Sequence, residues 1–296
     1  MSRRMQVLLD GDWLLYTAGF ACQHTEYLVF DPTDAMSFGP FDNKSAMKEA
    51  FDGNVPEGFN VYARTFLDPI DHTLHTVKQM MQSQVTKIEE HFNCMVESVT
   101  VYLDGNGNFR SELATIKPYK GNRAEASKPL AYNDIRQYLL DNYPTVVSNN
   151  CESDDCLATA LRQAGKDKAI CVGVDKDLLQ VPGLHLNPNK GFKKVSNSEG
   201  RTRLFRQAVM GDAVDNIGGA YKVGPKAAAK IITPNMCADA MWGATVEAYQ
   251  ATLEKYPDAN LYNGLDAFQA ALENMRLVYL QKEDPGKEPL WTPPDS

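Results

Sequence analysis

Four short apolar runs stand out along the chain, and each is followed by a polar stretch or by a helical pattern. They are Gln6–Leu9, Val99–Leu103, Thr145–Val147 and Ala169–Val174. Their length and their β-branched residues are typical of buried strands. Strands that alternate with helices predict an α/β fold, with a mostly parallel central sheet and helices on both faces.

The helices are predicted from apolar residues that recur every three or four positions. Residues 23–69 lack such a period and support no functional prediction, and residues 191–206 are predicted to be loosely structured and basic. In the predicted helix Asp71–Phe92 the apolar stripe indicates a core face rather than a cofactor site. Further helices are predicted at Trp13–Ala21, Asp134–Tyr143, after Glu152, from Pro225, near Ala238–Lys255 and at Leu265–Leu280.

An aspartate closes each of the three clearest strands. These residues are Asp10, Asp104 and Asp175. Aspartate is a common turn residue, so a single case is weak evidence. In a parallel sheet, however, ligands bind beyond the carboxyl ends of the strands. Three acids at that edge therefore predict a shared site.

Further acids occur in short clusters. The segment CESDDCLATAL places Glu152, Asp154 and Asp155 just before a helix, where acids also serve as ordinary caps. Asp177 follows Asp175 by two residues. Asp212 and Asp215 are three apart, so a helical turn would place both on one face. Asp12 is predicted to cap the first helix and to be mainly structural.

Carboxylates gathered in one pocket repel each other unless cations are present. Mg²⁺ and Mn²⁺ accept such hard oxygen ligands, and two ions can promote phosphodiester hydrolysis. The chain has no Walker A motif, no H-E-x-x-H motif and no convincing Ser–His–Asp set. The nine candidates for catalysis and for metal binding are Asp10, Asp104, Glu152, Asp154, Asp155, Asp175, Asp177, Asp212 and Asp215.

Two segments offer contacts to nucleic acid. The loop after Asp104 is rich in bases and includes Tyr119, an aromatic residue that suits stacking on a base; a solvated basic loop is the alternative. The segment MGDAVDNIGGAYKVGPKAAAKII predicts two short helices joined by a glycine hairpin, whose backbone N–H groups suit phosphate oxygens. The predicted DNA-binding residues are Arg110, Lys117, Tyr119, Lys120, Arg123, Gly218, Gly219, Val223, Gly224, Lys226 and Lys230.

Composition narrows the class of protein. With 296 residues, 43% hydrophobic and 23% charged, the chain is typical of soluble globular proteins. A net charge of −8 argues against a protein that coats nucleic acid nonspecifically. Asp10 and Asp12 interrupt the first apolar run, so neither a signal peptide nor a membrane helix fits. The six cysteines lack zinc-site spacing and indicate reduced, buried thiols, and hence a cytoplasmic protein.

Six segments, taken in order, resemble a known family. They are LLDGDWLLY, VYLDGNGNFRSEL, KPYKGNR, ESDDCLA, VGVDKDLL and VMGDAVDNIGGAYKVGPKAAAKII. From Val7 to Ile232 the series resembles the structure-specific 5′ nucleases, which include flap endonucleases, the 5′ nuclease domain of bacterial DNA polymerase I and phage 5′–3′ exonucleases. The short segment after KPYKGNR is most similar to the small phage enzymes.

The resemblance implies a PIN-like catalytic domain in residues 1–200 and a helical domain with a helix–hairpin–helix motif in residues 201–296. It implies two Mg²⁺ ions, which Mn²⁺ can replace, and a K⁺ ion at the hairpin Gly218–Lys230. Lys120 and Arg123 match bases that contact the scissile phosphate. The first metal group matches Asp10, Asp104, Glu152, Asp154 and Asp155, and the second matches Asp175, Asp177, Asp212 and Asp215.

The implied reaction removes nucleotides from the 5′ ends of duplex DNA, or 5′ flaps, and leaves 5′-phosphates. Expected substrates include nicked DNA and RNA–DNA hybrids, and the expected roles are phage replication, primer removal or DNA degradation by a monomer in the host cytoplasm. Only about residues 124–132 are left for a helical arch. Exonuclease action on duplex ends is therefore expected to dominate over flap cleavage.

Three alternatives remain open. A haloacid-dehalogenase-like phosphatase would use Asp10 of D-x-D as its nucleophile, but it explains neither ESDD nor the glycine hairpin. A noncatalytic DNA-binding module of the same fold would have lost some of the matched carboxylates, yet all are present. A ribonuclease of the same superfamily would use the same site.

Overall fold

A computed structural model describes residues 3–122, 127–287 and 290–294. The chain divides into two compact units. The first contains residues 1–12, 84–126 and 143–296, and the second contains residues 13–83 and 127–142. All of the predicted carboxylates belong to the first unit.

A six-stranded sheet forms the centre of the first unit, with the order β6-β5-β1-β7-β8-β9. Every neighbouring pair is parallel except β8 and β9. The central strand β7 is buried along its whole length, as expected where helices cover both faces of a parallel sheet. The strands are β1 (Arg3–Asp10), β5 (Cys94–Asn106), β6 (Thr145–Asn149), β7 (Ala169–Val172), β8 (Gly183–Asn187) and β9 (Gly191–Val195).

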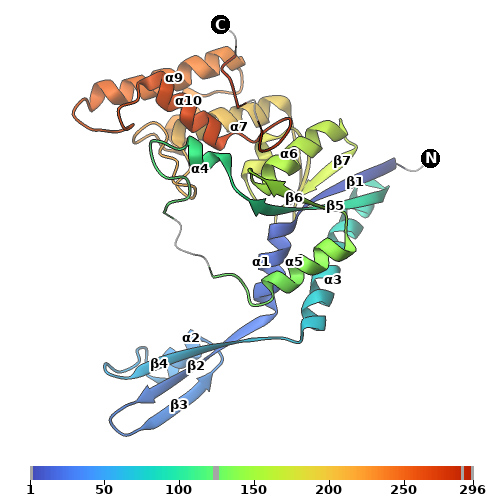
Figure 1. Ribbon diagram of the computed structural model, residues 1–296, viewed down its shortest axis with the longest axis vertical. Coiled ribbons are helices and arrows are strands. Elements are labelled where there is room, and N and C mark those ends of the chain that lie inside the picture. The colour runs from blue at the N-terminus through green and yellow to red at the C-terminus, as the bar shows by residue number, and fades with distance from the viewer. Residues whose placement is uncertain (1–2, 123–126, 288–289, 295–296) are drawn as a thin grey trace. The chain divides into compact units, whose positions relative to one another are not determined.

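Helices α6 (Ser153–Ala164) and α7 (Asn197–Met210) both begin with a capping box, in which the N-cap and N3 side chains each accept a hydrogen bond from the other residue's backbone N–H. Helix α6 lies along the sheet strands (Figure 1). The remaining helices of this unit are α4 (Phe109–Leu113), the 3₁₀ helix η1 (Asp177–Gln180), α8 (Pro225–Ile231), α9 (Ala238–Lys255) and α10 (Ala267–Val278).

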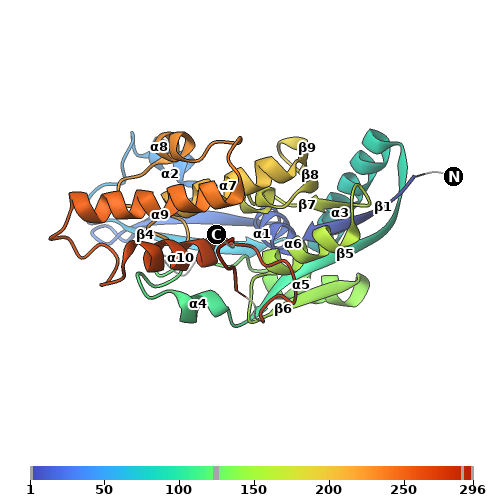
Figure 2. The ribbon, with the colours of Figure 1, turned by 90° about the horizontal axis from the view of Figure 1, so that it is seen from above.

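Helices α7, α9 and α10 share a separate core around Phe205, Met241, Tyr249 and Met275. Figure 2 shows α9 and α10 side by side. The predicted helical C-terminal region is therefore present. The boundary predicted between residues 200 and 201 falls inside α7, so this helical region begins at Asn197.

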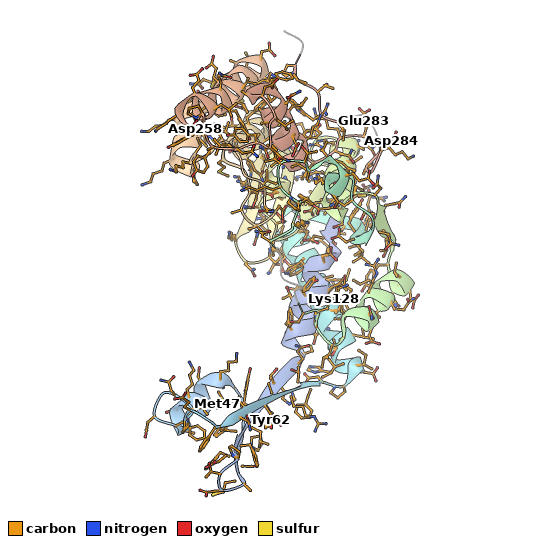
Figure 3. All side chains as sticks on the ribbon, turned by 60° about the vertical axis from the view of Figure 1, so that its left-hand side comes forward. Met47, Tyr62, Lys128, Asp258, Glu283 and Asp284 are labelled. Carbon is orange, nitrogen blue, oxygen red and sulfur yellow. The ribbon has the colours of Figure 1, made fainter. Side chains whose placement is uncertain are left out.

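The second unit contains a three-stranded antiparallel sheet, with β2 between β3 and β4. One side of it is packed by phenylalanines and Met47 of α2, whereas Tyr62 on β4 is 56% exposed (Figure 3). The elements are β2 (Gln23–Asp31), β3 (Met36–Phe41), α2 (Lys44–Ala50), β4 (Asn60–Leu67), α5 (Tyr132–Asn142), and most of α1 (Gly11–Ala21) and α3 (Ile70–Phe92).

The α/β fold with a mostly parallel sheet is confirmed, and two segments differ from the prediction. Residues 23–69 form this small sheet and α2. Its strands are held by pairing with one another, and their side chains do not alternate strictly between buried and exposed, so the sequence lacks the usual strand pattern. Residues 191–206, predicted to be loose, form β9 and most of α7. The basic residues of α7 are spread around an otherwise buried helix, which conceals its apolar period in the sequence. Among the described residues, no helix is long and apolar enough to cross a bilayer.

Candidate active site at the carboxyl edge of the sheet

Three predicted aspartates lie at the carboxyl ends of three adjacent strands. Strand β1 pairs with β5 on one side and with β7 on the other; Asp10 is the last residue of β1, Asp104 lies near the end of β5, and Asp175 follows the end of β7 by three residues. Gly11 makes this close approach possible, because a Cβ there would lie 2.8 Å from the carbonyl oxygen of Tyr102. The predicted convergence at the sheet edge is therefore present.

Asp154 lies at the centre of this cluster, on the first turn of α6. Burial raises its pKa well above the ordinary value, and the charges of Asp10, Asp175, Glu152 and Asp104 raise it further. Carboxylates from the end of β1, from β5, from the segment after β7 and from the start of α6 therefore surround this one side chain. Such a group is stable at neutral pH only if it takes up protons or if cations bind nearby.

Asp12 also belongs to the cluster, which corrects the prediction that it is a structural cap. Helix α1 already begins at Gly11, so Asp12 lies within its first turn. Burial, Asp104 and Asp10 raise the pKa of Asp12 to about 8. The D-x-D spacing was the signal in the sequence, since the turn after β1 returns the second acid to the same edge.

A second group of acids surrounds Lys176. Burial and then Asp175 raise the pKa of Asp177 to about 6. Burial alone would raise the pKa of Asp212, but the Nζ of Lys176, 2.9 Å from its Oδ2, lowers it on balance. Asp212 and Asp215 do not share a helical turn as predicted, because residues 212–217 form a tight turn closed by two backbone hydrogen bonds between Asp212 and Ile217.

Asp155 is predicted to be a metal ligand, but in the structure it forms a buried ion pair with Arg110. It is completely buried, and its Oδ2 and Oδ1 accept hydrogen bonds from Arg110 at 2.6 and 2.9 Å. The backbone N–H groups of Glu152 and Gln281 also donate to it. Because both oxygens are occupied by protein donors, Asp155 has no free face for a metal ion.

Arg110 is likewise not on a DNA-binding surface. Its side chain is 1% exposed, and besides Asp155 it donates to the carbonyl oxygens of Leu277 and Tyr279. The ion pair therefore joins α4 and the start of α6 to the end of α10. The sequence offered no sign of this, because Arg110 lies in a polar, base-rich loop.

The basic loop also points toward the acids. Lys120 forms an ion pair with Glu152, and the hydroxyl of Tyr119 donates to Glu152 and to Asp215, both within 3.2 Å. The backbone N–H of Lys120 donates to the carbonyl of Asp215. Tyr119 is thus a positioning residue rather than an exposed stacking platform. Lys117 is exposed beside Gly218, and Arg123 lies outside the described residues.

The glycine segment is a compact turn followed by one helix. A Cβ on Gly219 would lie 2.3 Å from the backbone N of Gly211, so the chain can cross itself only with glycine there. Gly218, Gly224 and Lys226 are exposed, and Pro225 starts α8, as predicted. The helix that precedes this turn is the long α7 rather than a short one. Val223 is partly buried and Lys230 is exposed.

The donor set of the acidic cluster fits hard divalent cations. Carboxylate oxygens are the ligands that Mg²⁺ and Mn²⁺ prefer, and the raised pKa values of Asp12, Asp154 and Asp177 mark where added positive charge would stabilise the folded chain. In the second unit, ligand atoms of Cys22, Asp68 and His72 lie within 4.8 Å of one another, which makes a separate candidate metal site. The cysteine spacing gave no indication of this group. All six cysteines are free thiols, but Cys237 is exposed rather than buried.

Comparison with known proteins identifies the family. Residues 58–202 match the family model of the 5′–3′ exonuclease N-terminal resolvase-like domain. Residues 58–202 belong to this 5′–3′ exonuclease domain family. Its members are phosphodiester hydrolases, so the assignment made from the motifs is confirmed. The matched span of the exonuclease domain contains Asp104, Asp154 and Asp175 but not Asp10 or Asp212.

One curated protein and two solved structures are similar to this chain. DNA polymerase I of Rhizobium leguminosarum is 32% identical over 140 residues, which cover 42% of this chain and only 14% of the polymerase. The bacteriophage T5 flap endonuclease, in a pseudo-enzyme–product complex with DNA and metal ions, matches with a TM-score of 0.53 and 16% identity over 93% of this chain and 89% of its own. The T5 5′-exonuclease with bound zinc matches with a TM-score of 0.52 and 18% identity over the same shares.

These structural matches share the fold of the exonuclease domain and its helical C-terminal region. The phosphatase alternative has no comparable observation in its favour.

Replacing Asp155 by Ala is expected to destabilise the protein by about 3–5 kcal/mol, because it leaves a buried guanidinium unpaired. The double variant Arg110→Met/Asp155→Leu is expected to recover most of that loss, since it removes both charges. Urea unfolding of the three proteins in EDTA measures this. If Asp155→Ala were as stable as the wild type but had lost its affinity for Mn²⁺, Asp155 would be a ligand after all.

In EDTA, the stability of the wild type is expected to fall as pH rises from 6 to 8. The folded chain holds the Asp12 proton up to about pH 8, whereas the unfolded chain releases it near 3.8. Unfolding therefore releases the Asp12 proton in this range, so each rise of one pH unit favours the unfolded chain by at most about 1.4 kcal/mol. Thermal unfolding at pH 6, 7 and 8 measures the slope. Asp12→Asn should flatten it, and an unchanged slope would place the titration elsewhere.

Proposed function

We propose that this chain is a metal-dependent 5′–3′ exonuclease that hydrolyses phosphodiesters from the 5′ ends of duplex DNA. The observation that carries the proposal is the convergence of Asp10, Asp104, Asp154 and Asp175 at one sheet edge. The match of residues 58–202 to the exonuclease domain supports it independently. The similar T5 structures include complexes with metal ions and with DNA, which supports the proposal that this chain binds divalent metal ions and DNA. Nicked duplexes, 5′ flaps and RNA–DNA hybrids are further substrates in this proposal, and the protein acts as a monomer in phage replication or DNA degradation.

Two Mg²⁺ ions, or Mn²⁺ in their place, would be held by two groups of acids. When bound, they would supply Lewis-acid stabilisation and a more acidic water. The first group is Asp10, Asp104, Glu152 and Asp154, with Asp12 added, and the second is Asp175, Asp177, Asp212 and Asp215. Asp155 is left out of both groups, because Arg110 occupies its carboxylate.

The chain's own bases would orient the substrate. Lys120, which is paired with Glu152, would exchange that carboxylate for a phosphate oxygen of the substrate. Tyr119 holds Glu152 and Asp215 in position during that exchange. Arg123 is proposed to act beside Lys120.

The turn at Gly218 and Gly219 and the start of α8 would contact duplex backbone. Exposed Lys117 and Lys226 add positive charge there, and Lys230 lies one turn further along α8. Backbone N–H groups and lysines bind phosphates without reading sequence. A K⁺ ion at this turn is part of the proposal.

The balance between exonuclease and flap endonuclease action follows from the short segment at residues 124–132. We propose that it is too short for a long closed arch, so blunt and nicked duplexes are cut faster than flapped ones. Equal or faster cleavage of flaps would contradict this part.

Cleavage of a 5′-labelled and a 3′-labelled duplex, with Mg²⁺ and with EDTA, tests the main proposal. Short 5′-labelled products are expected early and only with Mg²⁺. Asp154→Asn is expected to slow cleavage by about a hundredfold or more, because it removes a central charge from the cluster.

Asp258→Asn serves as the matched control, because Asp258 lies exposed in the loop after α9 and carries the same chemical change (Figure 3). It should retain the wild-type rate. Metal-independent binding of duplex without cleavage would instead favour the noncatalytic DNA-binding module.

A further inference from the structure

A cavity of about 890 Å³ lies in the first unit, away from the carboxylates. Its wall includes Ala169, the first residue of β7, whereas the acidic cluster follows the last residue of that strand. The end of α6, strand β9, the start of α7 and the segment after α10 complete it. The cavity thus opens at the amino end of the sheet, and its volume is in the range of small-molecule sites.

The lining carries a strong excess of positive charge. Among the lining residues that the structure describes, Asp167 is the one acid, and it pairs with Lys194 at 2.8 Å. Among the described residues, none of the other four cations makes a salt bridge with a carboxylate. The five cations are Arg162, Lys166, Lys194, Arg201 and Lys282. In a chain of net charge −8, this concentration favours an anionic ligand.

Two of the arginines are held in place by the protein. Arg162 donates through one guanidinium nitrogen to the carbonyl oxygens of Leu280 and Gln281, so its other nitrogens remain available. The Nε of Arg201 is buried without a hydrogen-bond partner. A fixed guanidinium with unused donors is a good phosphate ligand, because little side-chain entropy is lost on binding.

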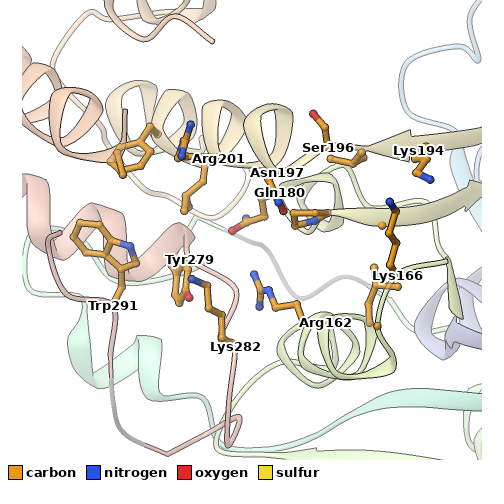
Figure 4. Close-up of a pocket in the computed structure, with 18 of the residues that line it drawn as sticks. Arg162, Lys166, Gln180, Lys194, Ser196, Asn197, Arg201, Tyr279, Lys282 and Trp291 are labelled. Carbon is orange, nitrogen blue, oxygen red and sulfur yellow. The ribbon is translucent and has the colours of Figure 1, made fainter. Parts of the chain in front are cut away.

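Aromatic rings line the other end of the cavity. Trp291 packs against Trp242 at 5.0 Å and against Phe205 at 6.2 Å between ring centroids, which fixes the indole. Figure 4 shows Trp291 and Tyr279 at one side, Lys166 and Lys194 at the opposite side, and Arg162 and Lys282 between them.

We propose that this cavity binds a nucleoside phosphate, with the base on the aromatic side and the phosphate among Arg162, Lys166 and Lys282. A nucleotide combines a flat ring with an anion, and aromatic stacking together with charge-assisted hydrogen bonds recognises the two parts. The site is distinct from the proposed catalytic acids and from the turn proposed to contact duplex DNA.

Calorimetric titration of the full chain with adenosine 5′-monophosphate, in EDTA, tests the proposal. EDTA removes metal ions through which a phosphate could bind the catalytic acids. One nucleotide per chain is expected, bound about tenfold or more tightly than either adenosine or inorganic phosphate. The fluorescence of the tryptophans should change with the same saturation.

Lys166→Ala/Lys282→Ala should weaken binding by about tenfold or more. Lys78→Ala/Lys87→Ala, on the exposed side of α3, makes the same change of net charge and should bind like the wild type. Both variants should unfold at the wild-type temperature and keep the wild-type nuclease rate, since neither pair belongs to the proposed catalytic site.

Absence of nucleotide binding would overturn the proposal, and so would equal weakening in both double variants. Tighter binding of a single-stranded oligonucleotide than of the mononucleotide, lost in Lys166→Ala/Lys282→Ala, would show that the cavity holds a DNA strand instead. Phosphate binding as tight as nucleotide binding would show that the aromatic side is unused.

Discussion

Electrostatic repulsion among carboxylates at one sheet edge is the constraint on which the rest of the structure depends. Asp154 is surrounded by four other acids, and burial strengthens every pairwise repulsion. A folded chain tolerates this only if the strands and helices that carry the acids are fixed by other interactions. The parallel pairing of β1 with β5 and β7 fixes one side, and the buried Arg110–Asp155 pair fixes the start of α6.

The two neighbouring aspartates of ESDD therefore have different roles, one in the acidic cluster and one in the core. Asp154 faces the acids, whereas Asp155 turns inward and joins α6 to α4 and to the end of α10. The carboxylate of Glu152 is also held by protein groups, because Tyr119 donates a hydrogen bond to it and Lys120 forms an ion pair with it. Protein partners therefore hold Glu152 and Asp155 in place, whereas Asp154 is left among the other acids.

Much of the sheet was predictable, because buried strands closed by aspartates leave a plain pattern in the sequence. Asp10, Asp104 and Asp175 reach the same edge for that reason. The sequence does not show which acid of a helical turn points toward the cluster, so it predicts Asp155 as a ligand and Asp12 as a cap, whereas Asp155 is bound by Arg110 and Asp12 lies among the acids. Nor could it show that Asp212 and Ile217 close a tight turn by backbone pairing, or that β2 pairs with the distant β4 in the small sheet of residues 23–69.

Anomalous diffraction from crystals soaked in Mn²⁺ tests the central claim most directly. The account predicts manganese peaks among the sheet-edge acids, with Asp10, Asp104 or Asp154 as ligands of one ion and Asp175 or Asp177 as ligands of another. Asp155 should keep both hydrogen bonds from Arg110. Manganese bound to Asp155 with that ion pair broken, or no manganese among these acids, would contradict the account.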